Sequence, residues 1–156
     1  MRPHSATPVA IALGSNLGDR EAHLHRALDA LRPHVAALHA SSFHETAPVG
    51  VGDQPPFLNA ASVGETSLSA RALLNVMLDI EKQGGRERPY AGAPRTLDLD
   101  LILYGDAVID TPGLVVPHPR FRQRRFVLAP LSEIAPDWRD PVTGRTVAEL
   151  LAALSA

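Results

Sequence analysis

Residues 96–104 read TLDLDLILY and form the clearest strand in the chain. Successive side chains of a strand point to opposite faces, so residues two apart share a face. The pattern therefore predicts one face made of leucine and an opposite face that begins with two aspartates. The first face contains Leu97, Leu99, Leu101 and Leu103, and the second contains Asp98, Asp100, Ile102 and Tyr104.

The two aspartates of this strand are candidate metal ligands. At the usual rise of a strand, Asp98 and Asp100 lie roughly 6.5–7 Å apart and point the same way. Such a pair can hold hard cations, and Mg²⁺ commonly completes its shell with water and substrate phosphates. Three neighbours favour this metal site: the same face continues as apolar, Arg95 stands just upstream, and a Gly- and Pro-rich stretch, 84–94, precedes the pair. An ordinary solvated acidic face is the alternative.

The rest of the chain predicts further strands and helices around this strand. Strands are expected at 8–14, 35–46 and 57–66, helices from Asp19 to Pro33 and from Ser69 to Gly84, a hairpin at 108–110 and 114–116, and helices at 125–135 and 146–154. Two stretches, 47–56 and 84–94, are too rich in Gly and Pro for regular structure. The order is typical of a ferredoxin-like βαββαβ sandwich, an α+β fold with an antiparallel sheet, here with a C-terminal α/β appendage.

Length and composition limit the class of protein. With 156 residues and 45% apolar residues, we expect one domain, 1–156, in which 1–7 and about 140–156 are peripheral. A net charge of -2 argues against a protein that coats DNA or RNA. The absence of cysteine excludes disulfides, thiolate catalysis and cysteine-ligated zinc. The apolar stretch near the N-terminus is too short for a signal peptide or membrane span, so we expect a cytoplasmic protein with no membrane partner. We also expect a monomer with no nucleic-acid partner.

Arginine outnumbers lysine fourteen to one, and half of the arginines fall in two short segments on either side of the aspartate strand. These segments contain Arg86, Arg88 and Arg95, and then Arg120, Arg122, Arg124 and Arg125. Arginine recognises phosphate with a planar fork, and arginines beside paired carboxylates suit a metal–polyphosphate complex. A genome-wide preference for arginine codons and a solvated basic face are the alternatives, which the residues alone leave open.

Several short motifs occur in a defined order along the chain. The most specific is PRTLDLDL at 94–101, and it is accompanied by ALGSNLG at 12–18, DQP at 53–55, FLNA at 57–60, Ile80-Glu81 to Arg86, VPH at 116–118, and FVL at 126–128 with Pro130-Leu131. From about Val9 to Trp138 the chain resembles the 6-hydroxymethyl-7,8-dihydropterin pyrophosphokinases of folate biosynthesis.

This resemblance implies an activity and a set of site residues. The family transfers pyrophosphate from ATP to 6-hydroxymethyl-7,8-dihydropterin and releases AMP and the pterin diphosphate. The resemblance implies that Asp98 and Asp100 hold two Mg²⁺ ions. It implies that Arg86 and Arg95 are the catalytic cations on the triphosphate of ATP. The matching nucleotide-binding positions are Glu81, Arg88, Leu101, His118 and Arg124.

The resemblance also implies a pterin site. The matching positions are Thr46, Val49, Phe57, Asn59 and Phe126. Phe57 and Phe126 would stack on the two faces of the pterin and Asn59 would bond its polar edge. The segments 47–56 and 84–94 would close over the two substrates and exclude water.

Two other functions stay open at this stage. The first is a ferredoxin-like module that presents its arginines to RNA, although such a module would need exposed aromatics where this strand has two aspartates. The second is a pterin-binding protein that has lost the transfer reaction. The release of AMP from ATP in the presence of the pterin separates the main hypothesis from both.

Overall fold

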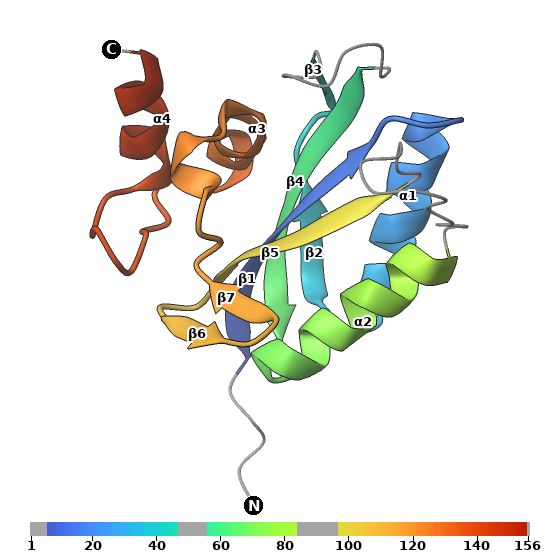
Figure 1. Ribbon diagram of the computed structural model, residues 1–156, viewed down its shortest axis with the longest axis horizontal. Helices are drawn as coiled ribbons and strands as arrows, with labels where there is room; N and C mark the ends of the chain where they lie inside the picture. The colour runs from blue at the N-terminus through green and yellow to red at the C-terminus, as the bar shows by residue number, and fades with distance from the viewer. Residues whose placement is uncertain (1–5, 47–55, 84–96, 156) are drawn as a thin grey trace, which may run out of the picture.

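The computed structural model describes residues 6–46, 56–83 and 97–155, and Figure 1 shows the arrangement of its elements. The first part of the chain forms β1 (Thr7–Ser15), α1 (Arg20–Leu31), β2 (Ala36–Ala40), β3 (His44–Thr46), β4 (Phe57–Thr66), α2 (Ala70–Gln83) and β5 (Asp98–Tyr104). The second part forms β6 (Ile109–Thr111), β7 (Leu114–Val116), the 3-10 turn η1 (Phe121–Gln123), α3 (Arg125–Ile134) and α4 (Val147–Ser155). The two stretches predicted to be loops fall mostly on 47–55 and 84–96, outside the described residues.

The main sheet has the strand order β2-β4-β1-β5, with β3 also paired to β4, and every recorded pairing is antiparallel. This is the predicted βαββαβ order, because α1 leads from β1 to β2 and α2 leads from β4 to β5. The stretch 35–46 was expected to be one strand, and the structure divides it into β2 and β3. Figure 1 shows α1 and α2 on one face of the sheet and α3 and α4 on the other.

Local signals in the sequence define the ends of the two sandwich helices. Asp19 caps α1, because its Oδ1 accepts a hydrogen bond of 3.2 Å from the amide of Ala22. Ser69 caps α2 in the same way, because its Oγ accepts a bond of 3.1 Å from the amide of Ala72. The predicted starts of both helices are therefore confirmed.

Two hydrophobic cores lie on the two faces of the sheet. The first core lies under α1 and α2 and includes Ile11, Leu13, Leu24, Leu31, Leu73, Met77, Leu99 and Leu101. The second core lies under α3 and α4 and includes Ala10, Ala12, Ile102, Leu103, Phe121, Leu128, Leu131 and Val147. A β-strand buried on both faces reads as a nearly continuous apolar run, as β1 does.

The predicted faces of β5 are wrong at its C-terminal end. The pairing with β1 shifts register, so that Ala10 faces Leu103 and Ile11 faces Leu101, which leaves Ile102 as an extra residue in β5. Such a β-bulge reverses the alternation beyond it. Leu103 therefore joins the second core, and Tyr104 lies against the first core.

The C-terminal residues contribute to the second core. We expected about 140–156 to be peripheral, but Val147 and Leu150 of α4 are buried there. Asp140 is fully buried and pairs with Arg122, whose Nη2 lies 2.9 Å from Asp140 Oδ1. The amide of Val142 also donates to Asp140 Oδ1, at 3.0 Å. This carboxylate thus connects η1 to the loop that leads into α4.

Among the described residues, no helix has the length and apolar character needed to cross a membrane.

The Asp140 carboxylate predicts a dependence of stability on pH. Burial would raise the pKa of Asp140, but hydrogen bonds from Arg122, Thr143 and Val142 outweigh burial and lower the pKa from 3.8 to about 2. Because the folded form has the lower pKa, its contribution is complete above about pH 4 and is lost as the pH falls toward 2. We expect Asp140→Asn to lower the free energy of unfolding by about 2 kcal/mol at pH 7.

Denaturant titrations of wild type and Asp140→Asn between pH 7 and pH 2 measure this contribution. The difference between the two proteins should shrink as the pH falls below 4. A difference that is the same at every pH would contradict the assignment to a charged carboxylate.

Candidate functional site

The register of the sheet aligns four residues in one row across one face. Asp98 of β5 is paired with Gly14 of β1, Gly14 with Asn59 of β4, and Asn59 with His44 of β3. Paired residues of antiparallel strands share a face, and adjacent strands are about 4.8 Å apart. Asp98 and Asn59 therefore lie about 10 Å apart across the sheet. The acidic pair and the predicted pterin-binding asparagine share the face that carries the second core.

The acidic half of this row gains a histidine from outside the sheet. Both aspartates are partly exposed, and Nε2 of His118 lies 3.9 Å from Oδ1 of Asp100. The amide of His118 donates a 3.0 Å bond to the carbonyl of Ile102, which fixes this segment to β5. Nδ1 of His118 accepts a 3.2 Å bond from the amide of Arg120. A neutral ring then carries its hydrogen on Nε2, toward Asp100.

The charge of this histidine follows from its surroundings. Burial of the ring, reinforced by the Arg124 and Arg120 guanidinium groups, lowers the pKa of His118, although the carboxylate of Asp98 opposes this shift. His118 is therefore neutral at neutral pH, and its ring adds no positive charge beside the two aspartates.

The two aspartates fit a metal ion whose coordination shell is completed by phosphate. Among the described residues, no group of three or more His, Asp or Glu side chains is arranged to hold a metal ion by itself. Mg²⁺ in nucleotide sites is commonly held by one or two carboxylates, with water and substrate phosphates as the remaining ligands. Asp98 and Asp100 match that second arrangement and not an all-protein cage.

Glu81 of α2 holds the backbone of the strand that carries the aspartates. Its side chain is 6% exposed, and its Oε2 accepts a 2.8 Å bond from the amide of Leu99. Leu99 lies between the two aspartates, and β5 is the outer strand of the sheet. Glu81 was predicted as a nucleotide contact, and here its carboxylate fixes the free edge of β5. The residues around Glu81 in the sequence do not predict this role, because α2 and β5 meet only in the folded protein.

Leu101 is the other predicted nucleotide position on β5. Its side chain is 5% exposed and belongs to the first core, on the face opposite Asp98 and Asp100. Any contact of Leu101 with a ligand at the acidic pair must therefore come from its backbone.

The other half of the row is built around Asn59. Its Nδ2 donates a 2.6 Å bond to Oγ1 of Thr46, which lies opposite Phe57 in the pairing of β3 with β4. A Cβ placed on Gly14 would lie 3.0 Å from Oδ1 of Asn59 and 3.7 Å from the ring of Phe57. Gly14 thus provides the space in which both side chains rest on β1.

An arginine and a phenylalanine lie together at the start of α3. The guanidinium carbon of Arg124 lies 5.4 Å from the ring centre of Phe126, and 38% of Phe126 is exposed. Arg124 also helps to lower the pKa of His118, so its guanidinium lies near that ring as well as near Phe126. An exposed aromatic ring next to a cation can take part in cation–π contact and can stack on a flat ligand.

Four of the predicted site residues lie outside the described residues: Val49, Arg86, Arg88 and Arg95. Of the other ten, Glu81 and Leu101 lie on the side of the first core. Two groups lie toward the other face. The acidic group contains Asp98, Asp100, His118 and Arg124, and the second group contains Thr46, Phe57 and Asn59. Phe126 lies beside Arg124 at the start of α3.

A separate hollow of about 270 Å³ lies on the opposite side of the sheet, between α1 and α2. Its lining comes from both helices and from Leu97, a residue of the first core: His23, Arg26, Ala27, Asp29, Ala30, Ile80, Gln83 and Leu97. It is therefore on a different face from the two groups above.

Comparison with known proteins relates this site to a family. The 7,8-dihydro-6-hydroxymethylpterin-pyrophosphokinase (HPPK) family matches residues 10–136, a range that contains every predicted site residue. The chain is 49% identical over 126 residues to the 2-amino-4-hydroxy-6-hydroxymethyldihydropteridine pyrophosphokinase of Bacillus subtilis, covering 80% of this chain and 75% of that protein. It is 42% identical over 147 residues to the protein of the same name from Pseudomonas aeruginosa, covering 93% and 90%.

Solved structures agree with the fold. Wild-type HPPK-DHPS of Plasmodium falciparum superimposes with a TM-score of 0.77 at 13% identity, covering 96% of this chain and 45% of that one. A triple mutant of the same protein with pteroate gives a TM-score of 0.76 at 14% identity, covering 95% and 43%. This chain thus spans less than half of those structures. The likeness, together with the strand order, confirms the predicted ferredoxin-like fold.

The contact between Glu81 and Leu99 predicts a local effect on β5. Glu81→Ala removes the acceptor of a buried amide, which lowers stability by about 1–3 kcal/mol. We expect the Leu99 amide to exchange with solvent at least about tenfold faster in this variant. Native-state hydrogen exchange measures this rate, and amides of the β1–β4 ladder serve as the internal reference.

Glu81→Gln is the matched control, since its carbonyl oxygen can still accept the bond from Leu99. It should keep most of the protection. Equal protection of Leu99 in wild type and Glu81→Ala would show that Glu81 does not hold this edge.

Proposed function

We propose that this chain, which belongs to the 7,8-dihydro-6-hydroxymethylpterin-pyrophosphokinase family, transfers pyrophosphate from ATP to 6-hydroxymethyl-7,8-dihydropterin. The hydroxymethyl oxygen attacks the β-phosphorus of ATP, the bond to the bridging α,β-oxygen breaks, and AMP leaves while the hydroxyl proton is lost. The observation that carries this proposal is the row Asp98–Gly14–Asn59, which brings the acidic pair and Asn59, the proposed pterin contact, to one face.

The acidic group is the proposed phosphate end of the site. Asp98 and Asp100 would hold two Mg²⁺ ions. Such ions neutralise the charge of the triphosphate and align it with the attacking oxygen. His118, neutral and with its Nε2 hydrogen toward this region, can donate a hydrogen bond to a phosphate or to Asp100. Arg124 adds a fixed positive charge beside it.

The second group is the proposed pterin end. The bond from Asn59 Nδ2 to Thr46 fixes the amide, so that Oδ1 stays over Gly14 and can accept from the amino edge of a pterin. Phe57 and Phe126 supply aromatic faces for stacking. One polar edge contact with two flat apolar contacts is the pattern expected for a small heteroaromatic ligand.

The remaining functional assignments are part of this proposal. Arg86 and Arg95 act on the triphosphate during transfer. Glu81, Arg88 and the Leu101 backbone bind the nucleotide, and Val49 contributes to the pterin site. ATP is the co-substrate, the reaction depends on Mg²⁺, and the chain acts as a monomer in the cytoplasm.

An assay of the nucleotide product tests this function. With ATP, Mg²⁺ and 6-hydroxymethyl-7,8-dihydropterin, we expect AMP and pterin diphosphate in equal amounts, and no turnover when the pterin or Mg²⁺ is left out. Chromatography of nucleotides and pterins measures both products. Release of ADP would mean a different transfer, and binding of the pterin without AMP would mean a protein that has lost the reaction.

Asp98→Asn tests the role of the acidic pair. Even outer contacts of metal ligands are worth about 10- to 100-fold in metal affinity or activity, so loss of a carboxylate ligand should lower kcat by more than about 100-fold. Asp106→Asn is the matched control, because Asp106 is an exposed aspartate just beyond the other end of β5. Unchanged activity of Asp98→Asn across a range of Mg²⁺ concentrations would contradict the metal assignment.

A further inference from the structure

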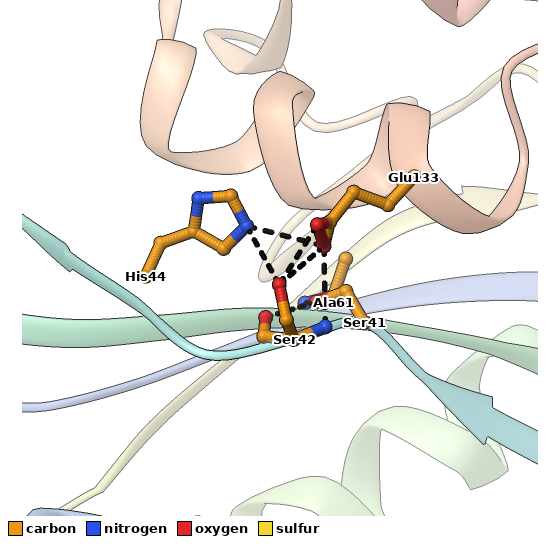
Figure 2. Close-up of polar contacts among 5 residues, drawn as sticks. All are labelled: Ser41, Ser42, His44, Ala61 and Glu133. Atoms are coloured by element: carbon orange, nitrogen blue, oxygen red, sulfur yellow. Dashed lines mark hydrogen bonds and ion pairs between the residues drawn. The ribbon is translucent and has the colours of Figure 1, made fainter.

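A cluster on the face of α3 that turns toward the sheet has no place in the reaction described above. It consists of Ser42, His44 and Glu133, and we call it the Glu133 clamp. Figure 2 shows the Ser42 and His44 side chains directed at the carboxylate of Glu133, with Ser41 and Ala61 beside them. We propose that Glu133 is a positioning residue that holds β3 against α3. It would thereby set the distance between the two sides of the pterin site, which are β3 with Thr46 and α3 with Phe126. This inference rests on the proposed function.

The contacts of the clamp converge on one carboxylate. The amide of Ser42 donates to Oε1 of Glu133 at 3.1 Å, and the Ser42 hydroxyl lies 2.9 Å from Oε1 and 2.8 Å from Oε2. Nε2 of His44 lies 3.1 Å from Oε1. These groups are 89 and 91 residues from Glu133 in the chain, so the carboxylate joins segments that are connected only through the fold.

The geometry excludes a nucleophilic triad. The ring of His44 contacts both the Ser42 hydroxyl, at 3.3 Å, and Glu133 through the same nitrogen, Nε2. In a Ser-His-acid triad, the base uses opposite ring nitrogens for the nucleophile and the acid. Ser42 also bonds the carboxylate directly, so its hydroxyl hydrogen is directed at Glu133. The cluster is therefore a contact between two elements and not a hydrolytic site.

The segment before β3 is fixed from its other side by the sheet. The amide of Ser41 donates to the carbonyl of Ala61 at 2.8 Å, and the Ser41 hydroxyl accepts from the Ala61 amide at 2.9 Å. Ser41 thus faces β4 while Ser42 faces α3. The break between β2 and β3 falls at these residues, so the clamp holds the chain at the point where β3 begins.

Both elements joined by the clamp carry pterin-site residues. On β3, Thr46 lies two residues after His44 and therefore on the same face, where it bonds Asn59. On α3, Phe126 lies seven residues before Glu133, which places both on one side of the helix and about two turns, or 10.5 Å, apart. The same helix face thus presents Glu133 to β3 and carries Phe126, whose ring lies beside Arg124, the cation that acts on His118 of the acidic group.

Charge strengthens these contacts. Burial would raise the pKa of Glu133, but the hydrogen bonds from Ser42 and His44 outweigh it and lower the pKa. Glu133 is therefore ionised at neutral pH, and hydrogen bonds to an ionised acceptor are stronger than those between neutral groups.

The test separates positioning from general stability. In Glu133→Ala we expect the KM for 6-hydroxymethyl-7,8-dihydropterin to rise about 10- to 100-fold. Without the carboxylate, β3 can shift relative to α3, and a shift of about 1 Å is enough to misplace the groups that contact the pterin. The KM for ATP should change less than about twofold, since the clamp does not touch the acidic group. Glu133→Gln keeps one acceptor oxygen for Ser42 and should recover much of the pterin affinity.

Glu149→Ala is the matched control. Glu149 accepts a 2.8 Å bond from the amide of Thr146 at the start of α4, so its loss removes a hydrogen bond between a glutamate and a backbone amide outside the site. It should lower the melting temperature without changing the KM for the pterin. If Glu133→Ala does not fold, Ser42→Ala replaces it, with a smaller rise in the same KM.

The outcomes distinguish this inference from the proposed function. A wild-type chain that neither binds nor converts the pterin would overturn the proposed function. An active wild type with the same pterin KM in Glu133→Ala would overturn the positioning role alone. An equal rise of KM in Glu149→Ala would also overturn it, because the effect would then follow from lost stability.

Discussion

The antiparallel register across β5, β1, β4 and β3 is the constraint on which the rest of the site depends. It fixes Asp98, Gly14, Asn59 and His44 in one row, and a slip of one strand by one residue would turn its side chain in this row to the other face. Two side-chain contacts support this register, one at each edge of the sheet. Glu81 holds the outer edge of β5, and Glu133 holds β3 at the opposite side.

Much of the fold could be predicted from local patterns. The order of strands and helices, the caps at Asp19 and Ser69, and the shared face of Asp98 and Asp100 all follow from residues close together in sequence. The bulge at Ile102 could not be predicted, since an apolar run such as LILY fits either face and only the pairing with β1 decides. Leu103 and Tyr104 therefore exchange sides relative to strict alternation.

The site divides in the same way. The aspartate pair could be predicted because two charges interrupt an apolar strand. Glu81 and Glu133 could not, because in the sequence they look like ordinary helix carboxylates. Their partners are a backbone amide 18 residues away and a serine 91 residues away, which no local pattern connects. Gly14 is similar: its importance comes from Asn59 and Phe57 resting on it, a contact between strands. Residues that bind ligands could thus be predicted better than residues that position them.

If the aspartate pair and Asn59 belong to one site, Mn²⁺ bound at the aspartates will broaden NMR signals from both by its paramagnetism. Mn²⁺ takes the oxygen ligands that suit Mg²⁺. With Mn²⁺ and a non-hydrolysable ATP analogue, amide signals should broaden most at Asp98, Asp100 and His118, and next at Asn59, about 10 Å across the sheet. Thr66, about 23 Å from Asn59 along β4, should broaden far less. Broadening centred on His23 and Arg26, with Asn59 unaffected, would place the metal and nucleotide on the opposite side of the sheet, away from Asn59.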